Sequence, residues 1–278
     1  MERIVVTGAS GFIGKNLIPK LKNYETLCPS RAEMDITKSE EVKRYFDKTG
    51  KVSYLIHLAS SIPRGTTDNL GYYLINTLGT ANICQNALFD KIIFTSSENV
   101  YGEDGTFSES DECLPKTHYA TSKLLAEKFV EMTKKWYCIL RCSSIYGIGD
   151  QNQTRLIPNV MKKAVSGETL EIWGSGNGAK DYLYVDDVTE AILASIGRAY
   201  GGVFNIGYGD VITKKEIIAE IAKLADVEIR FVNNASWDMK MVMEIRKAEE
   251  YLKWKPQISW QEGLKRTYEY WNKQVRRS

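Results

Sequence analysis

The sequence has little of what marks several classes of protein. Its 278 residues include two histidines and five scattered cysteines without paired spacing, so we expect no metal site and no disulfide framework. Lys plus Arg number 37 against 35 for Asp plus Glu, a balance that favours neither a nucleic-acid nor a membrane-surface partner. No apolar run approaches the roughly 18 residues of a membrane span. The N-terminus carries no leader-like apolar segment, so we expect a cytoplasmic protein.

Short apolar runs alternate with helical patterns through the first half of the chain. The expected strands are residues 4–6, 26–28, 54–57, 92–95 and 138–140. Such alternation predicts an α/β fold, with a doubly wound parallel sheet and a cofactor across the carboxyl ends of its strands. From about Gly147 loops and short elements follow, with helices expected at residues 156–165, 185–195, 214–224 and 260–271. We expect Asp186 or Asp187 to cap the second of these helices, and residues 273–277 to form a solvated tail.

This change, from alternating strands and helices to loops and short elements, predicts two regions. Residues 1–147 form the cofactor-binding domain, and residues 148–278 are mainly a substrate-binding region, with the chain re-entering the first domain around 180–206.

Three glycines follow the first expected strand directly. Gly8 would allow a tight turn, Gly11 would let backbone amides approach a pyrophosphate, and Gly14 would let the next helix pack closely on its strand. Phe12 and Ile13 open that helix, whose positive end would face the phosphates. A strand before the glycines and an amphipathic helix after them favour a dinucleotide cradle over an ordinary turn.

A second informative stretch places Tyr119 and Lys123 four residues apart, on one face of an expected helix. An ammonium near the phenol would move its pKa towards neutrality, so Tyr119 could exchange a proton with a sugar hydroxyl or carbonyl. Ser97, which follows the fourth strand, could hydrogen-bond the same oxygen. The alternative is a surface helix with a lysine extended into solvent. The cradle upstream favours catalysis, because the features together supply named roles for one site.

The chain resembles the extended short-chain dehydrogenase/reductases, in particular the NAD(P)-dependent nucleotide-sugar epimerase/dehydratase group. Besides the cradle and the tyrosine–lysine pair, the motifs that carry the resemblance are residues 57–59, 76–80, 95–102, 140–141, 146–147, 172–174, 180–182, 185–187, 205–207 and 254–256. The resemblance implies a Rossmann domain that binds a nicotinamide cofactor, and a smaller C-terminal region that grips a nucleoside-diphosphate sugar. It also implies that Ser97, Tyr119 and Lys123 are catalytic, with the tyrosine as acid and base for hydride transfer at a sugar carbon, usually C4. On the cofactor side it adds Leu58, Ala59, Ser60 and Asn76, and it implies that Tyr119 and Lys123 also contact the cofactor, the lysine by holding the nicotinamide ribose.

Cofactor choice depends on the end of the second strand, where NAD-binding proteins carry an acidic residue for the ribose hydroxyls. Ser30 stands at that position, and the guanidinium of Arg31 could pair with a 2′-phosphate, so NADP is favoured over NAD. The resemblance places Asp35 and Ile36 near the adenine. The alternative is that Arg31 is a solvated loop cation.

Several residues are expected on the substrate side. By resemblance, Lys180 contacts the diphosphate, Trp173 packs near the nucleotide base, and Ser144 replaces an asparagine that often meets the substrate. Further candidates are Glu98, Asn205, which could be structural, Lys240, and Arg64 in the loop from Ser60 to Thr67, which could equally face solvent.

The reaction stays open between a 4-epimerase and an NADPH-dependent 4-ketoreductase. Dehydration is the least favoured reaction, because Glu98-Asn99 supplies one carboxyl where the similar 4,6-dehydratases carry an acid/base pair. A hypothesis from another class is a non-catalytic, cofactor-binding regulatory protein, although such relatives usually lose the tyrosine or the lysine. By analogy with the family we expect a homodimer formed through residues 70–88 and 119–133.

Overall fold

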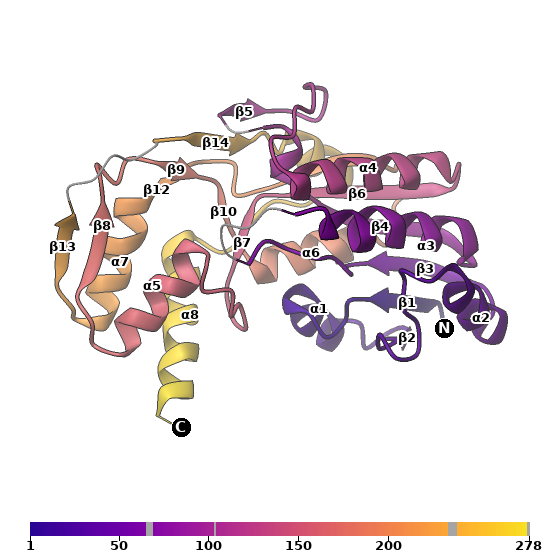
Figure 1. The fold of residues 1–278 in the computed structure, drawn as a ribbon, viewed down its shortest axis with the longest axis horizontal. Coiled ribbons are helices and arrows are strands. Elements are labelled where there is room, and N and C mark those ends of the chain that lie inside the picture. The colour runs from indigo at the N-terminus through magenta and orange to yellow at the C-terminus, as the bar shows by residue number, and fades with distance from the viewer. Residues whose placement is uncertain (65–68, 103, 233–237, 277–278) are drawn as a thin grey trace.

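The structure is a computed structural model that describes residues 1–64, 69–102, 104–232 and 238–276. A parallel six-stranded sheet has the order β11-β6-β4-β3-β1-β2. Its strands are β1 (Arg3–Thr7), β2 (Glu25–Leu27), β3 (Val52–His57), β4 (Phe89–Ser97), β6 (Trp136–Cys142) and β11 (Gly202–Ile206). The first five overlap the five runs expected from the sequence, so the predicted α/β doubly wound class is confirmed. The carboxyl ends of the strands point towards a smaller second lobe (Figure 1).

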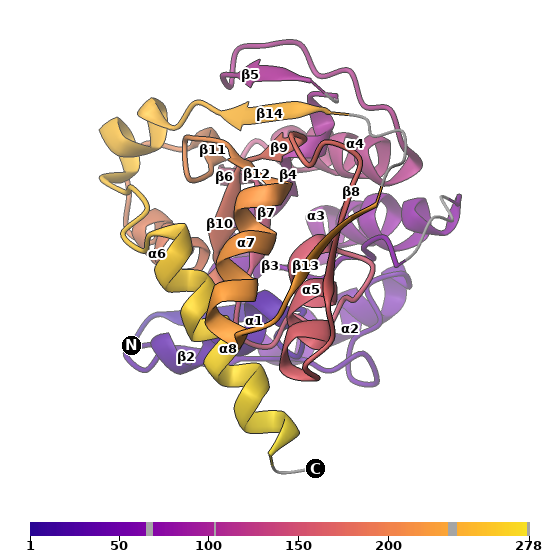
Figure 2. The same ribbon diagram turned by 90° about the vertical axis from the view of Figure 1, so that its left-hand side faces the viewer.

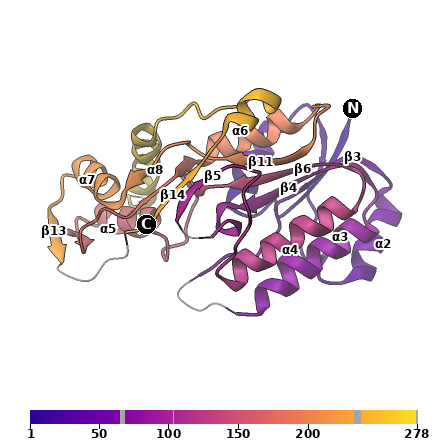
Figure 3. The same cartoon turned by 90° about the horizontal axis from the view of Figure 1, so that it is seen from above.

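Helices cover both faces of this sheet. One face carries α2 (Ser39–Thr49), α3 (Thr80–Asn86) and α4 (His118–Met132), which run side by side (Figure 3). The other carries α1 (Phe12–Leu17) with its extension η1 (Ile18–Lys20), α6 (Val185–Ser195) and the π-helical turn η4 (Ala248–Leu252). Within β1, Ile4 and Val6 pack into the second of these layers and Val5 into the first, as the two-residue period of a strand requires. Strands buried on both faces read as continuous apolar runs, which is why they were visible in the sequence.

The second lobe has its own apolar core. It is built from α5 (Leu156–Val165), α7 (Lys214–Ala225), α8 (Trp260–Val275) and β8 (Leu170–Trp173). The strand β13 (Ile229–Val232) pairs with β8 in parallel, and its side chains are mostly exposed; this lobe is in front in Figure 2. Two small sheets join the lobes: β7 (Ser144–Tyr146) with β10 (Tyr182–Tyr184), and β5 (Gly105–Phe107), β9 (Ala179–Lys180), β12 (Ile212–Thr213) and β14 (Lys240–Met243). The chain returns from this lobe through α6 and β11, which pairs with β6.

Two local expectations are corrected. No side chain caps α6: Tyr184 is its N-cap residue, and the Asp187 carboxylate instead accepts hydrogen bonds from the backbone amides of Gln257 and Ile258. The helix α8 continues to Val275, so the basic end does not begin as a tail at Lys273. At Asp187, hydrogen bonds to a distant segment take the place of the expected helix cap. At Lys273, the helix continues past the end expected from the sequence.

Candidate active site

The glycine cradle forms between β1 and α1. Gly8 has φ of +74°, and a Cβ there would stand 2.6 Å from the backbone nitrogen of Ala59. A Cβ on Gly14 would stand 2.5 Å from the carbonyl oxygens of Gly8 and Ala9. Gly11 is the N-cap of α1 and provides no side-chain cap. The turn therefore demands glycine at both ends and keeps side chains away from the first amides of the helix.

Three candidate catalytic residues converge at the carboxyl edge of the sheet, on the side of the second lobe. Ser97 ends β4, and its hydroxyl is close enough to the phenol of Tyr119, in the first turn of α4, to lower the pKa of that phenol by hydrogen bonding. Thr117 caps α4 by accepting a hydrogen bond from the amide of Ala120, which fixes where the helix begins. Asn99 donates to Oγ of Ser97 through its backbone and side-chain nitrogens, at 3.3 and 3.1 Å. The serine hydrogen is therefore left to point towards the tyrosine.

The Tyr119 ring is packed edge-on against Tyr72, with ring centroids 5.8 Å apart. Burial raises the pKa of Tyr119 to about 12, although the Ser97 hydrogen bond acts in the opposite direction. This is opposite to the shift towards neutrality that the sequence suggested. The physical reason is that desolvation of the phenolate outweighs the attraction of Arg155.

Lys123 is buried, at 2% exposure, and its ammonium is directed at β4. Nζ donates a 2.6 Å hydrogen bond to the carbonyl oxygen of Thr95 and lies 4.3 Å from the centroid of the Phe94 ring. Burial lowers the pKa of this amine to about 8. The lysine is thus held between α4 and β4, and its pKa lies about one unit above neutral pH.

A carboxyl group lies directly beside this trio. Glu98 follows Ser97 in the turn η3 (Glu98–Val100) and is 2% exposed. Its Oε1 accepts a 2.8 Å hydrogen bond from Ser144, while Oε2 is buried without a partner. Burial raises the pKa of Glu98 to about 7, against the opposing attraction of Lys180. The group is therefore able to hold a proton at neutral pH.

The comparisons with known proteins agree with this geometry. The model of the NAD dependent epimerase/dehydratase family matches residues 4–207. The chain belongs to this family. A putative UDP-glucose 4-epimerase of Methanocaldococcus jannaschii is 30% identical over 299 residues, which cover 95% of this chain and 96% of the relative. Human dTDP-D-glucose 4,6-dehydratase is 28% identical over 317 residues, covering 97% and 90%.

The same similarity extends to solved structures. The crystal structure of UDP-glucose 4-epimerase from Thermotoga maritima with UDP-glucose has a TM-score of 0.86 and 26% identity to this chain, and the match covers 98% and 99% of the two chains. The membership predicted from the motifs is confirmed.

The cradle of this epimerase/dehydratase family member fits the nicotinamide cofactor for which the family is named. Any side chain larger than hydrogen at Gly8 or Gly14 would collide with backbone, and the first turn of α1 has no side-chain cap, so amides are left for a pyrophosphate. Such a cofactor would supply the hydride acceptor and donor of a redox step. Leu58, Ala59 and Ser60 follow β3 at the same edge, with the Ala59 amide donating to Oγ1 of Thr7 at 3.3 Å.

Asn76 connects the cofactor loop to the catalytic helix. It is 1% exposed and lies in the π-helix η2 (Tyr73–Gly79). Its Oδ1 accepts from the Ser61 amide at 2.7 Å and from the Ser60 hydroxyl at 3.0 Å, and its Nδ2 donates to the Ser122 hydroxyl at 2.9 Å. The asparagine therefore holds the loop after β3 against α4, between Tyr119 and Lys123.

The end of β2 carries the residues expected to select the cofactor. The Ser30 hydroxyl donates to Glu33, and Arg31 forms an ion pair with Asp35 through Nε at 3.1 Å. The Arg31 side chain is 77% exposed, so its terminal amines remain accessible. Ile36 is buried behind them, against the helix layer.

The expected substrate residues lie on several elements. Lys180 in β9 is close enough to act on the Glu98 carboxyl electrostatically, and Ser144 reaches the same carboxyl directly. Trp173 ends β8 in the second lobe with 56% exposure. Arg64 and Lys240 are exposed, and the Ser60–Thr67 loop extends past the described residues.

Asn205 lies apart from these residues. It is fully buried, accepts from Tyr101 and donates to the Phe107 and Glu244 carbonyls, so its side chain is engaged in the fold.

Two residues beside the site were missed by sequence reasoning. Arg155 donates to the Ile145 carbonyl and pairs with Asp150 at 3.1 Å, and its charge acts on both Tyr119 and Glu98. It stands in a loop without a motif, so nothing in the sequence singled it out. Phe94 was seen only as a strand residue, because its contact with Lys123 comes from the packing of α4 on β4.

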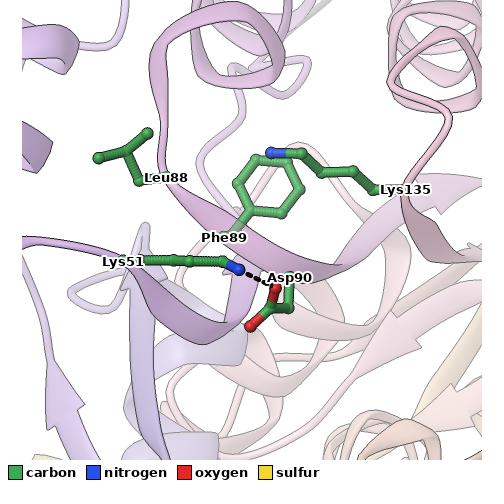
Figure 4. Close-up of a pocket in the computed structure, with 5 residues that line it drawn as sticks. All are labelled: Lys51, Leu88, Phe89, Asp90 and Lys135. Atoms are coloured by element: carbon green, nitrogen blue, oxygen red, sulfur yellow. Dashed lines mark ion pairs between the residues drawn. The ribbon is translucent and has the colours of Figure 1, made fainter.

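A surface pocket of about 230 Å³ lies at the opposite edge of the sheet, where β3 and β4 begin. Lys51 pairs there with Asp90, and the Lys135 ammonium lies over the Phe89 ring (Figure 4). This pocket is remote from the candidate catalytic residues.

Across the described parts of the chain, no group of three or more His, Cys, Asp or Glu side chains could hold a metal ion. The helices in these parts are also too short or too polar to span a membrane.

Proposed function

We propose that the chain transfers hydride between a nicotinamide cofactor and C4 of a nucleoside-diphosphate sugar. The observation that carries the proposal is the convergence of Ser97, Tyr119 and Lys123 beside the glycine cradle. The relatives support the substrate class, because their names give UDP-glucose or dTDP-D-glucose as the substrate. The site faces the second lobe, where Lys180 would bind the diphosphate and Trp173 would pack near the base.

Each catalytic side chain then has one task. The phenol of Tyr119 gives a proton to the C4 oxygen as the carbonyl is reduced, and takes it back when the alcohol is oxidised. The Ser97 hydroxyl, oriented by Asn99, hydrogen-bonds the same oxygen. The Lys123 ammonium lowers the energy of the phenolate once a ligand has displaced water, against the burial that raises the pKa of the phenol.

We propose NADP as the cofactor. Arg31 is largely exposed, and its ion pair with Asp35 engages only Nε, so the terminal amines can form a fork with a 2′-phosphate. Ser30 supplies no carboxylate to repel that phosphate. A cofactor that is exchanged at each turnover suits a 4-ketoreductase, whereas a 4-epimerase must retain it. A dehydratase would need a second acid/base carboxyl beside Glu98, but the next residue, Asn99, is an amide whose side chain hydrogen-bonds Ser97.

The test is the identity of the cofactor that the purified protein carries, found by denaturing release and mass spectrometry, followed by titration with NADPH and NADH. Protein that binds NADPH much more tightly, and that reduces a 4-keto-6-deoxy nucleotide sugar, supports the ketoreductase. Tightly retained NAD with interconversion of UDP-glucose and UDP-galactose supports the epimerase. Cofactor binding without turnover of any nucleotide sugar would favour the non-catalytic regulatory protein.

We further propose a homodimer formed through η2 and through α4, the helix that carries Tyr119 and Lys123. Leu74 and Leu78 on η2 are 52% and 46% exposed, and Leu125 and Phe129 on the neighbouring α4 are 42% and 36% exposed. The two helices pack side by side, so these residues form one apolar surface across both. Joining two copies there would cover it.

A further inference from the structure

The partners of the Lys123 ammonium are unusual for a buried cation. In the described chain, Nζ contacts the neutral carbonyl oxygen of Thr95 at 2.6 Å and the face of the Phe94 ring at 4.3 Å. No ion pair involves it there. The carboxylate one helical turn away, Glu127, is bound instead by Arg141, at 2.7 Å from Nη2. The described residues therefore bind the Lys123 ammonium through a carbonyl oxygen and a ring face, and no carboxylate among them pairs with it.

The Phe94 ring is itself fixed from the neighbouring strand. His57 stacks on it, with ring centroids 5.5 Å apart and an interplanar angle of 24°. The two nitrogens of His57 contact the hydroxyls of Thr7 and Thr80, at 2.6 and 3.0 Å. Burial, with the repulsion of Lys123, lowers the pKa of His57 to about 3, so the imidazole is neutral at any working pH.

Among the described residues, the titratable groups that act on the ammonium are Glu127 on its own helix, His57 on β3 and Cys142 on β6. Tyr119 lies one helical turn before Lys123 on α4. The Cys142 thiol is buried and its pKa is raised to about 12, so it is neutral. Glu127 is matched by Arg141. Among the described side chains, Phe94 is thus the one in direct attractive contact with the cation.

We propose that Phe94 is a positioning residue for the catalytic ammonium, holding Nζ of Lys123 charged and in place through the π face of its ring. A ring face attracts a cation electrostatically, more strongly in a desolvated site, yet carries no net charge. A carboxylate at this position would bind the lysine but cancel its field at Tyr119. The inference rests on the role proposed for Lys123 in turnover, but the contact itself is tested without turnover.

The first test uses the full-length protein without substrate or cofactor. Phenylalanine at position 94 is replaced by analogues with increasing ring fluorination, which weakens the negative ring face with little change of shape. The pKa of Lys123 is followed by NMR of ¹³Cε-labelled lysine, with the signal assigned through Lys123→Met. A contact of the strength usual for buried cation–π pairs predicts a fall in pKa of about one unit for the most fluorinated ring.

The chain provides a matched control. The Lys135 ammonium lies 3.9 Å from the centroid of the Phe89 ring, far from the site. Fluorination at position 89 should lower the pKa of Lys135 and leave that of Lys123 unchanged, and fluorination at 94 should do the converse. A pKa of Lys123 that does not respond to fluorination at 94 would overturn the proposal, whether or not the protein turns over a nucleotide sugar.

A second measurement links the contact to catalysis. In Phe94→Leu, which keeps the site apolar, the alkaline limb of kcat/KM should move to lower pH by about one unit, because the amine loses its proton earlier. In Phe94→Tyr the limb should stay in place. A uniform loss of kcat at every pH would mean that Phe94 only fills space. Absence of turnover in the wild type would reject the proposed function while leaving the NMR result to decide this inference.

Discussion

The Ser144 hydroxyl donates a 2.8 Å hydrogen bond to Oε1 of Glu98, and the other oxygen of this buried carboxyl has no partner. One hydrogen bond does not offset the desolvation of a carboxylate, so burial raises the pKa of Glu98 from 4.5 to about 7. The folded protein therefore binds this proton more tightly than the unfolded chain. The contribution of Glu98 to stability is most favourable below pH 4.5 and is lost as the pH rises through 7.

We expect Glu98→Gln to relieve this loss. The variant should be stabilised relative to wild type at pH 8, by up to about 3 kcal/mol from the size of the shift, and should gain little at pH 5. Urea denaturation at the two pH values measures the difference. Asp181, whose pKa burial raises to about 6, acts electrostatically on Glu98, so the same comparison is repeated in an Asp181→Asn background. An equal gain at both pH values would contradict a titrating Glu98.

Arg31 should discriminate between cofactors. Its exposed guanidinium would form charge-assisted hydrogen bonds to a 2′-phosphate, so Arg31→Ala should weaken NADPH binding roughly 10- to 100-fold and change NADH binding little. Calorimetric titration of the two cofactors gives both values. Arg44→Ala, an exposed arginine on α2, is the matched control and should alter neither. If Arg31→Ala weakens both cofactors equally, the residue supports the loop and does not select NADP.

The oligomeric state should respond to charge on the exposed apolar surface of η2 and α4. Leu78→Arg with Phe129→Arg would place two cations in the proposed interface, and light scattering after size exclusion should report a monomer where the wild type is a dimer. Phe231→Arg is the control, because this residue is 67% exposed on β13 in the second lobe. A wild type that is monomeric at micromolar concentration would remove the proposed interface.

Much of this architecture was predictable because it depends on local patterns. The buried strands are continuous apolar runs, and the backbone at Gly8 and Gly14 leaves no space for a side chain. The spacing of Tyr119 and Lys123 also predicted that they share one face of a helix, but it could not predict where the lysine side chain points. That direction is set by the packing of α4 on β4, which brings Phe94 and Thr95 to the ammonium. The capping expected at α6 failed for the same reason, since Asp187 is used by a segment about 70 residues away.

The central claim is that Tyr119 serves hydride transfer at the sugar C4. The most direct test is a single turnover of protein loaded with oxidised cofactor, using a nucleotide sugar deuterated at C4, followed by mass spectrometry of the quenched cofactor. We expect deuterium in the reduced cofactor with the wild type and none with Tyr119→Phe, which should still bind the cofactor. A substrate deuterated at C5 should transfer no label. Label arising from C5, or transfer by Tyr119→Phe at the wild-type rate, would contradict the account.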